Sequence, residues 1–177
     1  ECRRIGPLPE LQRANDNHRR ETGIYDYADA DGEVIYRTVR IEQTGKRKRF
    51  EAQCPDGQGG WRNGLGDVRR VLYRLPDIEE AKREQEKPLI LLVEGERKAD
   101  KLASWGYTAT SCAFGCKGWR KQYADALAGC VVVILPDNDD EGRAFAERAA
   151  ADVARAGGEA HMLELAGLPP EGDNGDR

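Results

Sequence analysis

The sequence lacks any apolar run long enough to cross a membrane. Its longest run, Pro88 to Val93, is far shorter than the roughly 20 residues that span a bilayer. The N-terminus also lacks the basic and then apolar segments of an export signal. With 34% charged and 39% apolar residues, the composition is typical of a soluble globular protein. We therefore expect a cytoplasmic protein without a membrane partner, and the start at Glu1 rather than Met leads us to expect a segment of a longer chain.

Cysteine and histidine are also scarce among the 177 residues. Five cysteines without paired spacing argue against a disulfide framework and indicate a reducing compartment. Cys112 and Cys116 are close in sequence, but no second pair follows, and the only histidines are His18 and His161. The ligand spacing of a structural zinc site is therefore missing. Internal repeats and low-complexity tracts are missing as well.

Positive and negative charges are unevenly distributed along the chain. The net charge is −4, yet residues 37–74 carry 10 lysines and arginines against 4 aspartates and glutamates. Residues 88–177 carry 10 against 15. A basic segment beside an acidic one suits a protein that holds phosphates in one place and a metal ion in another. The alternative is that the basic residues form the solvated face of a small sheet.

The first half of the chain predicts a small β-rich subdomain. Residues 1–20 are polar, lack periodicity and contain two prolines, which indicates a linker or arm. Residues 21–87 contain alternating runs around the turn sequence DADG, followed by a second turn sequence, PDGQGG, and a charged helical stretch. We expect the aromatic residues Tyr25, Tyr27 and Trp61 in the core or on a sheet face rather than as stacking platforms.

Residues 88–177 alternate between strand-like and helix-like segments. The apolar runs show no polar alternation, as expected for strands that are covered on both faces. The expected elements are strands at 88–93, 107–113, 130–135 and 160–165, with helices at 95–106, 119–129 and 141–158 between them. This order predicts an α/β domain with a parallel sheet, right-handed crossovers and flanking helices.

Carboxylates follow two of these apolar strands. Glu94 comes directly after LILLV, and Asp137 and Asp139 come after VVVIL and one proline. Ligands of open parallel sheets bind beyond the carboxyl ends of the strands, so neighbouring strands would bring these acids together. Carboxylates that share a pocket raise one another's pKa values, and a hard cation such as Mg²⁺ or Mn²⁺ removes that penalty. We predict a metal site here, whereas the alternative is that Asp139 or Asp140 caps the following helix.

These motifs resemble the Toprim domain, the metal-binding module of bacterial-type DNA primases, topoisomerases and some nucleases. The family signature is a Glu-Gly after the first strand and an Asp-x-Asp after a later one. The matching residues here are Glu94-Gly95 and Asp137-Asn138-Asp139, and the resemblance covers residues 86–177. It implies a nucleotidyltransferase in which Glu94, Asp137 and Asp139 hold the metal, with Glu94 alternatively acting as a general base.

The preceding segment resembles the arm in front of Toprim in phage- and plasmid-type primases and primase–helicases. The matching stretches are YDYADADG, WRNGL and RRVLYRLP. The C-terminal GLPPEGDNGD resembles a primase ending that supplies further acids, so Asp173 and Asp176 are additional metal candidates unless this tail is only an acidic arm. Lys98 departs from the family pattern, because many primases have an aspartate there, and one firm metal site remains. The cysteine-rich zinc module of many primases has no counterpart in this sequence.

The resemblance implies a primase core that joins nucleoside triphosphates into short primers on single-stranded DNA. Basic side chains would bind phosphates of the template or of the nucleotide, and one tryptophan would stack on a base. The candidates are Lys46, Arg47, Lys48, Arg49, Arg69, Arg70, Arg74, Lys98, Lys117, Trp119, Arg120 and Lys121. The alternative is ordinary surface charge, with the tryptophan packed against the sheet.

Two other functions fit the same residues. A Toprim-type nuclease would use the acids to hydrolyse phosphodiesters, and a non-catalytic nucleic-acid-binding module would serve a larger replication protein. A topoisomerase would need a further tyrosine-bearing domain, for which 177 residues leave no room. For the primase we expect a helicase or a zinc-binding module in the same chain or in a partner chain.

Overall fold

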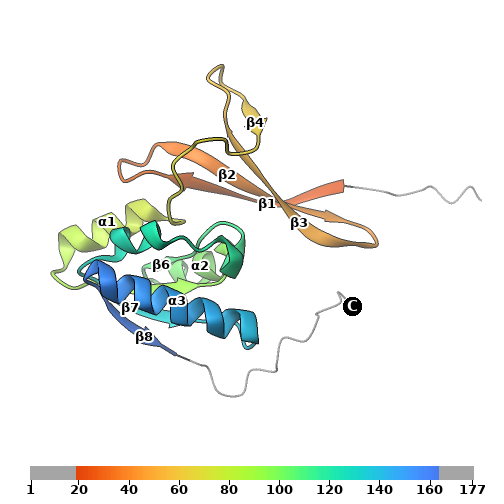
Figure 1. Cartoon of the computed structure of the whole chain (residues 1–177). Coiled ribbons are helices and arrows are strands. Elements are labelled where there is room, and N and C mark those ends of the chain that lie inside the picture. The colour runs from red at the N-terminus through yellow and green to blue at the C-terminus, as the bar shows by residue number, and fades with distance from the viewer. Residues whose placement is uncertain (1–18, 164–177) are drawn as a thin grey trace, which may run out of the picture.

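The chain forms two four-stranded sheets, and helices surround the second of them (Figure 1). The computed structural model describes residues 19–163. The metal candidates Asp173 and Asp176 lie outside the described residues, as does nearly all of the arm predicted for residues 1–20. In the described part of the chain, no helix has the length and apolarity needed to cross a membrane.

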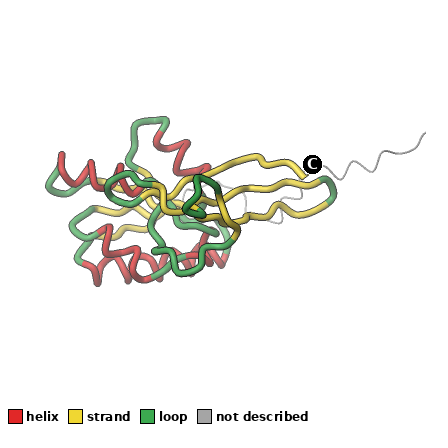
Figure 2. Tube along the Cα trace, turned by 90° about the horizontal axis from the view of Figure 1, so that it is seen from above, coloured by secondary structure: helices red, strands yellow, loops and turns green. Residues whose placement is uncertain are grey.

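The first sheet is an antiparallel meander, as the alternating runs predict. Its strands follow chain order: β1 (Arg19–Ala28), β2 (Val34–Gln43), β3 (Lys46–Pro55) and β4 (Trp61–Asn63). Asp29 closes the predicted hairpin at DADG, since its Oδ1 accepts backbone N–H bonds from Asp31 and Glu33 at 3.0 Å. Asp56 closes the turn between β3 and β4 in the same way. Seen from above, the long strands of the meander project beyond the helices (Figure 2).

The second sheet is entirely parallel, as predicted, with the strand order β6-β5-β7-β8. Its strands are β5 (Leu89–Val93), β6 (Ala109–Thr110), β7 (Val131–Leu135) and β8 (Glu159–Met162). The helices are α1 (Leu75–Glu84), α2 (Glu96–Ala103) and α3 (Asp140–Ala156), with the 3₁₀ segments η1 (Gly115–Gly118) and η2 (Lys121–Leu127). β5 and β7 are neighbours, and Val93 lies opposite Leu135. The residues that follow these two strands therefore emerge side by side at one edge of the sheet.

Two elements of the second half differ most from the prediction, and α2 also ends earlier than predicted, at Ala103. The strand expected over 107–113 is reduced to β6. The segment before α1 hydrogen-bonds to the residues that would continue this strand. Tyr73 N–H donates to Ser111 O at 2.9 Å, and Thr110 Oγ1 donates to Tyr73 O at 2.6 Å. The helix expected over 119–129 is instead the 3₁₀ segment η2, because the backbone is non-helical at Arg120 and again at Ala128, and 3₁₀ geometry is typical of such short segments.

Two clusters of buried side chains stabilise this arrangement. One lies between the parallel sheet and the helical segments α1, η2 and α3, and includes the fully buried Val132 and Phe145. The other joins the two sheets, because Tyr27 and Tyr36 of the meander belong to the same cluster as residues of β5 and α2. The rings of Tyr27 and Tyr36 are stacked with their centroids 4.4 Å apart. The prediction that Tyr25 and Tyr27 are core residues is confirmed, since both are buried.

A buried carboxylate lies where the two sheets meet. Glu96, the first residue of α2, is only 4% exposed. Its Oε1 accepts hydrogen bonds from Tyr27 Oη at 2.7 Å and from Thr38 Oγ1 at 2.9 Å. A buried acid is costly unless it is hydrogen-bonded, so these two hydroxyls fix β1 and β2 against the start of α2.

Replacing Tyr27 by Phe should therefore destabilise the protein although the ring is kept. We expect the free energy of unfolding to fall by about 1–3 kcal/mol, the usual cost of removing a donor from a buried acceptor. Urea denaturation measures this change. Tyr107→Phe is the matched control, because Tyr107 is 50% exposed and should tolerate the change. Equal stability of the Tyr27→Phe variant and the wild type would refute the structural role of Glu96.

Candidate functional site

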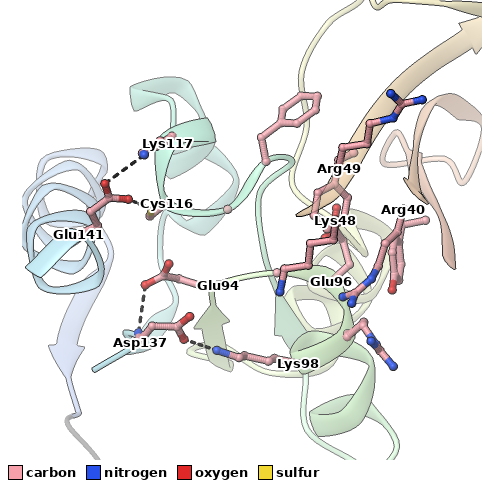
Figure 3. A pocket seen from close by; sticks show the side chains of 16 residues that line it. Arg40, Lys48, Arg49, Glu94, Glu96, Lys98, Cys116, Lys117, Asp137 and Glu141 are labelled. Carbon is pink, nitrogen blue, oxygen red and sulfur yellow. Dashed lines mark hydrogen bonds and ion pairs between the residues drawn. The ribbon is translucent and has the colours of Figure 1, made fainter. Parts of the chain in front are cut away.

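The two sheets face each other across a cleft of about 590 Å³, which we call the central cleft. Figure 3 shows Glu94 and Asp137 on one side of it, and Arg40, Lys48 and Arg49 on the other. The lining residues are Tyr25, Arg40, Lys48, Arg49, Phe50, Glu94, Gly95, Glu96, Arg97, Lys98, Phe114, Gly115, Cys116, Lys117, Asp137 and Glu141. The carboxyl end of the parallel sheet therefore faces the basic strands β2 and β3.

Glu94 and Asp137 are brought together as predicted, because they follow the neighbouring strands β5 and β7. The backbone N–H of Asp137 donates to Glu94 Oε1 at 3.0 Å. Gly142 makes this approach possible, since a Cβ at that position would lie 2.7 Å from Glu94 Oε1 and 2.5 Å from Asp137 O. The glycine after the second acidic motif is thus a packing requirement of the site.

Asp139 caps α3, which is the alternative that the sequence left open. Its Oδ1 accepts the backbone N–H of Gly142 at 2.6 Å. This hydrogen bond satisfies one of the free donors at the helix N-terminus and occupies one carboxylate oxygen. Within residues 19–163, no three histidine, cysteine or acidic side chains are grouped closely enough to hold a metal ion on their own.

Lys98 offsets part of the negative charge of Glu94 and Asp137. Burial raises the pKa of the Glu94 carboxyl, and the charges of Asp137 and Asp139 raise it further. The Asp137 N–H bond and the ammonium of Lys98 oppose this rise in pKa. Lys98 also forms an ion pair with Asp137, with the Asp137 side chain 20% exposed (Figure 3). The chain therefore supplies one cation of its own at the place where the sequence predicts a metal.

The other basic side chains of the central cleft differ in whether they form ion pairs. Lys117 pairs with Glu141 at 3.0 Å and Arg49 pairs with Glu51 at 3.0 Å. In contrast, no ion-pair partner is found for Lys48 or Arg97 among the described residues. These two side chains are the ones most readily available to an anionic ligand.

Several other predicted binding residues are not among the lining residues of the central cleft. Arg69 and Arg70 line a second pocket of about 380 Å³ beside η2. Arg74 forms ion pairs with Asp77 and Asp100, which gives it a structural role. The remaining basic candidates are Lys46, at the start of β3, Arg47, on the same strand, and Arg120 and Lys121, both exposed near η2.

Trp119 adopts the packed arrangement rather than that of a stacking platform. Its Nε1 donates to Asp152 Oδ2 at 2.9 Å, and its ring packs edge-on against Tyr123 and Phe145. The side chain is only partly exposed and is not among the lining residues of the central cleft. The indole therefore joins the 3₁₀ segment to α3.

Several lining residues were missed by sequence reasoning. Arg40 and Phe50 belong to alternating strands, and a count of period-2 positions could have placed Arg40 on one face of β2. Arg97 lies beside Glu96 in a charged helix, where nothing in the local pattern distinguishes it from surface charge. Phe114 and Cys116 lie in an irregular loop without any periodic signal.

The comparisons with known proteins identify the fold. No protein-family model matches the sequence, and a search of curated proteins finds no match. Among solved structures, the Aquifex aeolicus primase, with its zinc-binding and RNA polymerase domains, is 25% identical with a TM-score of 0.59. A DNA primase domain from Pseudomonas aeruginosa is 21% identical, also with a TM-score of 0.59. Each match covers 83% of this chain, which spans only 35% and 44% of those two chains.

The likeness to these structures establishes a primase-like fold. It includes both the meander and the parallel sheet, because 83% of the chain is aligned. The fold class predicted from the sequence is thus confirmed.

The raised pKa of Glu94 predicts a pH-dependent effect of Glu94→Gln. A carboxyl whose pKa is raised by folding destabilises the native state once the pH exceeds its ordinary pKa, and this penalty grows until the pH passes the raised pKa. Removing the charge should therefore raise the melting temperature at pH 7 and have little effect at pH 4. Thermal unfolding across this range, with the exposed Glu147→Gln as a control, measures the difference. An equal rise in melting temperature at pH 4 and at pH 7 would contradict a raised pKa of Glu94.

Proposed function

We propose that the chain is the catalytic core of a DNA primase, a nucleotidyltransferase that joins nucleoside triphosphates into short primers on single-stranded DNA. The observation that carries the proposal is the contact between Glu94 and Asp137 at the ends of two neighbouring strands, opposite a basic wall. The primase-like fold supports it. Toprim is the family that the two acidic motifs resemble, and the arm resembles that of phage- or plasmid-type members.

The donor set fits Mg²⁺ or Mn²⁺, because these ions prefer oxygen ligands and are commonly held by one or two carboxylates plus phosphate and water. Glu94, Asp137 and the second oxygen of Asp139 would hold the ion, and Asp173 and Asp176 are candidates from the tail. The ion would neutralise the triphosphate and polarise the attacked phosphorus.

The chain's own residues would bind and orient the substrates. Lys48 and Arg97 are available to phosphates, and Lys98 and Lys117 would exchange their carboxylate partners for phosphate oxygens. Glu94 would accept a proton from the primer 3′-hydroxyl more readily than an ordinary carboxylate does, because its pKa is raised. The longer primase would also contain a zinc-binding module or a helicase, in the same chain or in a partner.

One alternative is favoured by a specific observation. The Lys98–Asp137 ion pair already neutralises an acid of the metal motif, as would suit a non-catalytic nucleic-acid-binding module that has kept the fold. A metal-dependent nuclease would use the same acids without nucleotides. The experiments below separate these functions.

Lys98→Met tests whether the lysine and the metal compete for Asp137. Removing the ammonium should tighten Mn²⁺ binding in the absence of nucleotides by about 5-fold, the value of one partly exposed ion pair. Electron paramagnetic resonance of free Mn²⁺ gives the dissociation constant directly. Lys101→Met is the control, because Lys101 is an exposed residue of the same helix outside the cleft. Unchanged or weaker binding by the Lys98→Met variant would count against a metal site at Asp137.

A synthesis assay on single-stranded DNA with labelled nucleotides and Mg²⁺ or Mn²⁺ tests the function itself. Asp137→Asn should lower primer synthesis by more than about 100-fold, because metal catalysis contributes several kcal/mol. Asp139→Asn is informative because asparagine is also a good N-cap, so α3 is kept while the charge is lost. Asp67→Asn, at an exposed position outside the cleft, is the control.

Three results are decisive when this assay is combined with a DNA-binding titration. Synthesis that requires Asp137 supports the primase. Strand cleavage without nucleotides would replace it by the nuclease. DNA binding without either reaction, in a chain extended by its neighbouring segments, would favour the non-catalytic module.

A further inference from the structure

The central cleft contains two aromatic side chains that the core does not use. Phe50 on β3 and Phe114 before η1 both line the cleft and are 36% and 46% exposed. Neither belongs to the two buried clusters described above. Exposed phenyl rings lose the hydrophobic stabilisation that usually keeps this residue buried. Their presence in a cleft therefore points to a ligand that covers them.

The backbone at Phe114 strengthens this argument. Its φ is 68° and its ψ is 24°, in the left-handed region that a side chain with a Cβ disfavours. Among the described residues, Arg74 is the only other non-glycine residue with a positive φ, and its side chain is held by Asp77 and Asp100. Phe114, whose phenyl ring can form neither ion pairs nor side-chain hydrogen bonds of this kind, is 46% exposed. Strain of this kind clusters at functional sites.

The charges around the two rings indicate which ligand they would take. Lys48, Arg49 and Arg97 line the same cleft. A basic groove that also offers aromatic rings is the usual arrangement for single-stranded nucleic acid, whose bases are free to stack. Paired bases of a duplex are stacked on one another and cannot cover a ring in the same way. Trp119, the stacking candidate of the sequence, is packed elsewhere.

We propose that Phe50 and Phe114 stack on bases of single-stranded DNA in the central cleft, while Lys48 and Arg49 bind its phosphates. This inference rests on the proposed function and deepens it, because it names the groups that hold the template. The shared chemistry is a nucleobase, which could also come from a free nucleotide, and we assign the rings to the template strand. Binding is independent of the metal and of catalysis.

The test is the affinity for a fluorescently labelled single-stranded oligonucleotide, measured by anisotropy in EDTA. Phe114→Gly and Phe50→Ala should each weaken binding by about 5-fold or more, as expected for the loss of one stacked base. Trp105→Ala and Tyr107→Ala are matched controls, because these rings are 63% and 50% exposed but lie outside the cleft. Their affinities should equal that of the wild type.

A second measurement separates binding from folding. Glycine accepts a positive φ without strain, so Phe114→Gly should melt at the same temperature as the wild type or higher while it binds DNA more weakly. Phe114→Tyr should keep the affinity, because it keeps an aromatic face. A lower melting temperature of Phe114→Gly, with unchanged DNA affinity, would assign Phe114 a structural role and overturn the proposal.

Further outcomes decide whether the two rings bind bases of the template strand. Unchanged affinity in both cleft variants, or an equal loss in the Trp105→Ala and Tyr107→Ala controls, overturns the proposal. Nucleoside triphosphate binding is measured in a separate titration, and a loss of that affinity in the cleft variants with unchanged DNA affinity also overturns the proposal, in favour of a nucleotide site. Because the assay contains neither metal nor nucleotides, its result can be read whether or not primer synthesis is observed, and the two proposals fail independently.

Discussion

The buried carboxylate of Glu96 is the contact on which the geometry of the cleft depends. It is 4% exposed, begins α2 and accepts hydroxyl bonds from Tyr27 of β1 and Thr38 of β2. Only Gly95 separates it from Glu94. Whatever fixes Glu96 against the meander therefore also fixes Glu94 at the edge of the parallel sheet, opposite β2 and β3. Hydrogen bonds are directional, so those of Glu96 fix the position of Glu94 more precisely than apolar packing alone would.

The second constraint is electrostatic. Glu94 and Asp137 are held together by the pairing of β5 with β7 and by the close approach of Gly142, although their charges repel. Lys98 offsets part of this repulsion from within the chain. An anionic ligand that draws Lys98 away would leave Asp137 open to a metal ion, so binding of the two would be mutually favourable.

The fold class and the proximity of Glu94 and Asp137 could be predicted from the sequence, because both depend on local patterns. Unbroken apolar runs identify β5 and β7, and the carboxyl ends of neighbouring parallel strands always lie at the same edge. The sequence alone was thus enough to predict that Glu94 and Asp137 lie close together. In the sequence, a capping role and a metal-binding role were alternatives for Asp139; the structure shows the cap, and the proposed metal role is compatible with it because a carboxylate has two oxygens.

The rest of the site depends on tertiary contacts that no local pattern encodes. Phe114 and Arg97 enter the cleft only because two separate sheets meet there. The role of Trp119 was settled by Asp152, 33 residues away, whose carboxylate accepts the indole N–H. Similarly, β6 is short because Tyr73 binds Ser111 in its place. Long-range hydrogen bonds of this kind override strand and helix propensity.

The most direct test of the account is a crystal structure of the chain soaked with Mn²⁺ and a nucleoside triphosphate, with the ion located by its anomalous scattering. The account predicts one peak within direct coordination distance of both Glu94 and Asp137, with Lys98 moved away from Asp137. A peak bound to neither carboxylate, with the Lys98–Asp137 pair intact, would contradict the claim that these two strand ends form one cation site.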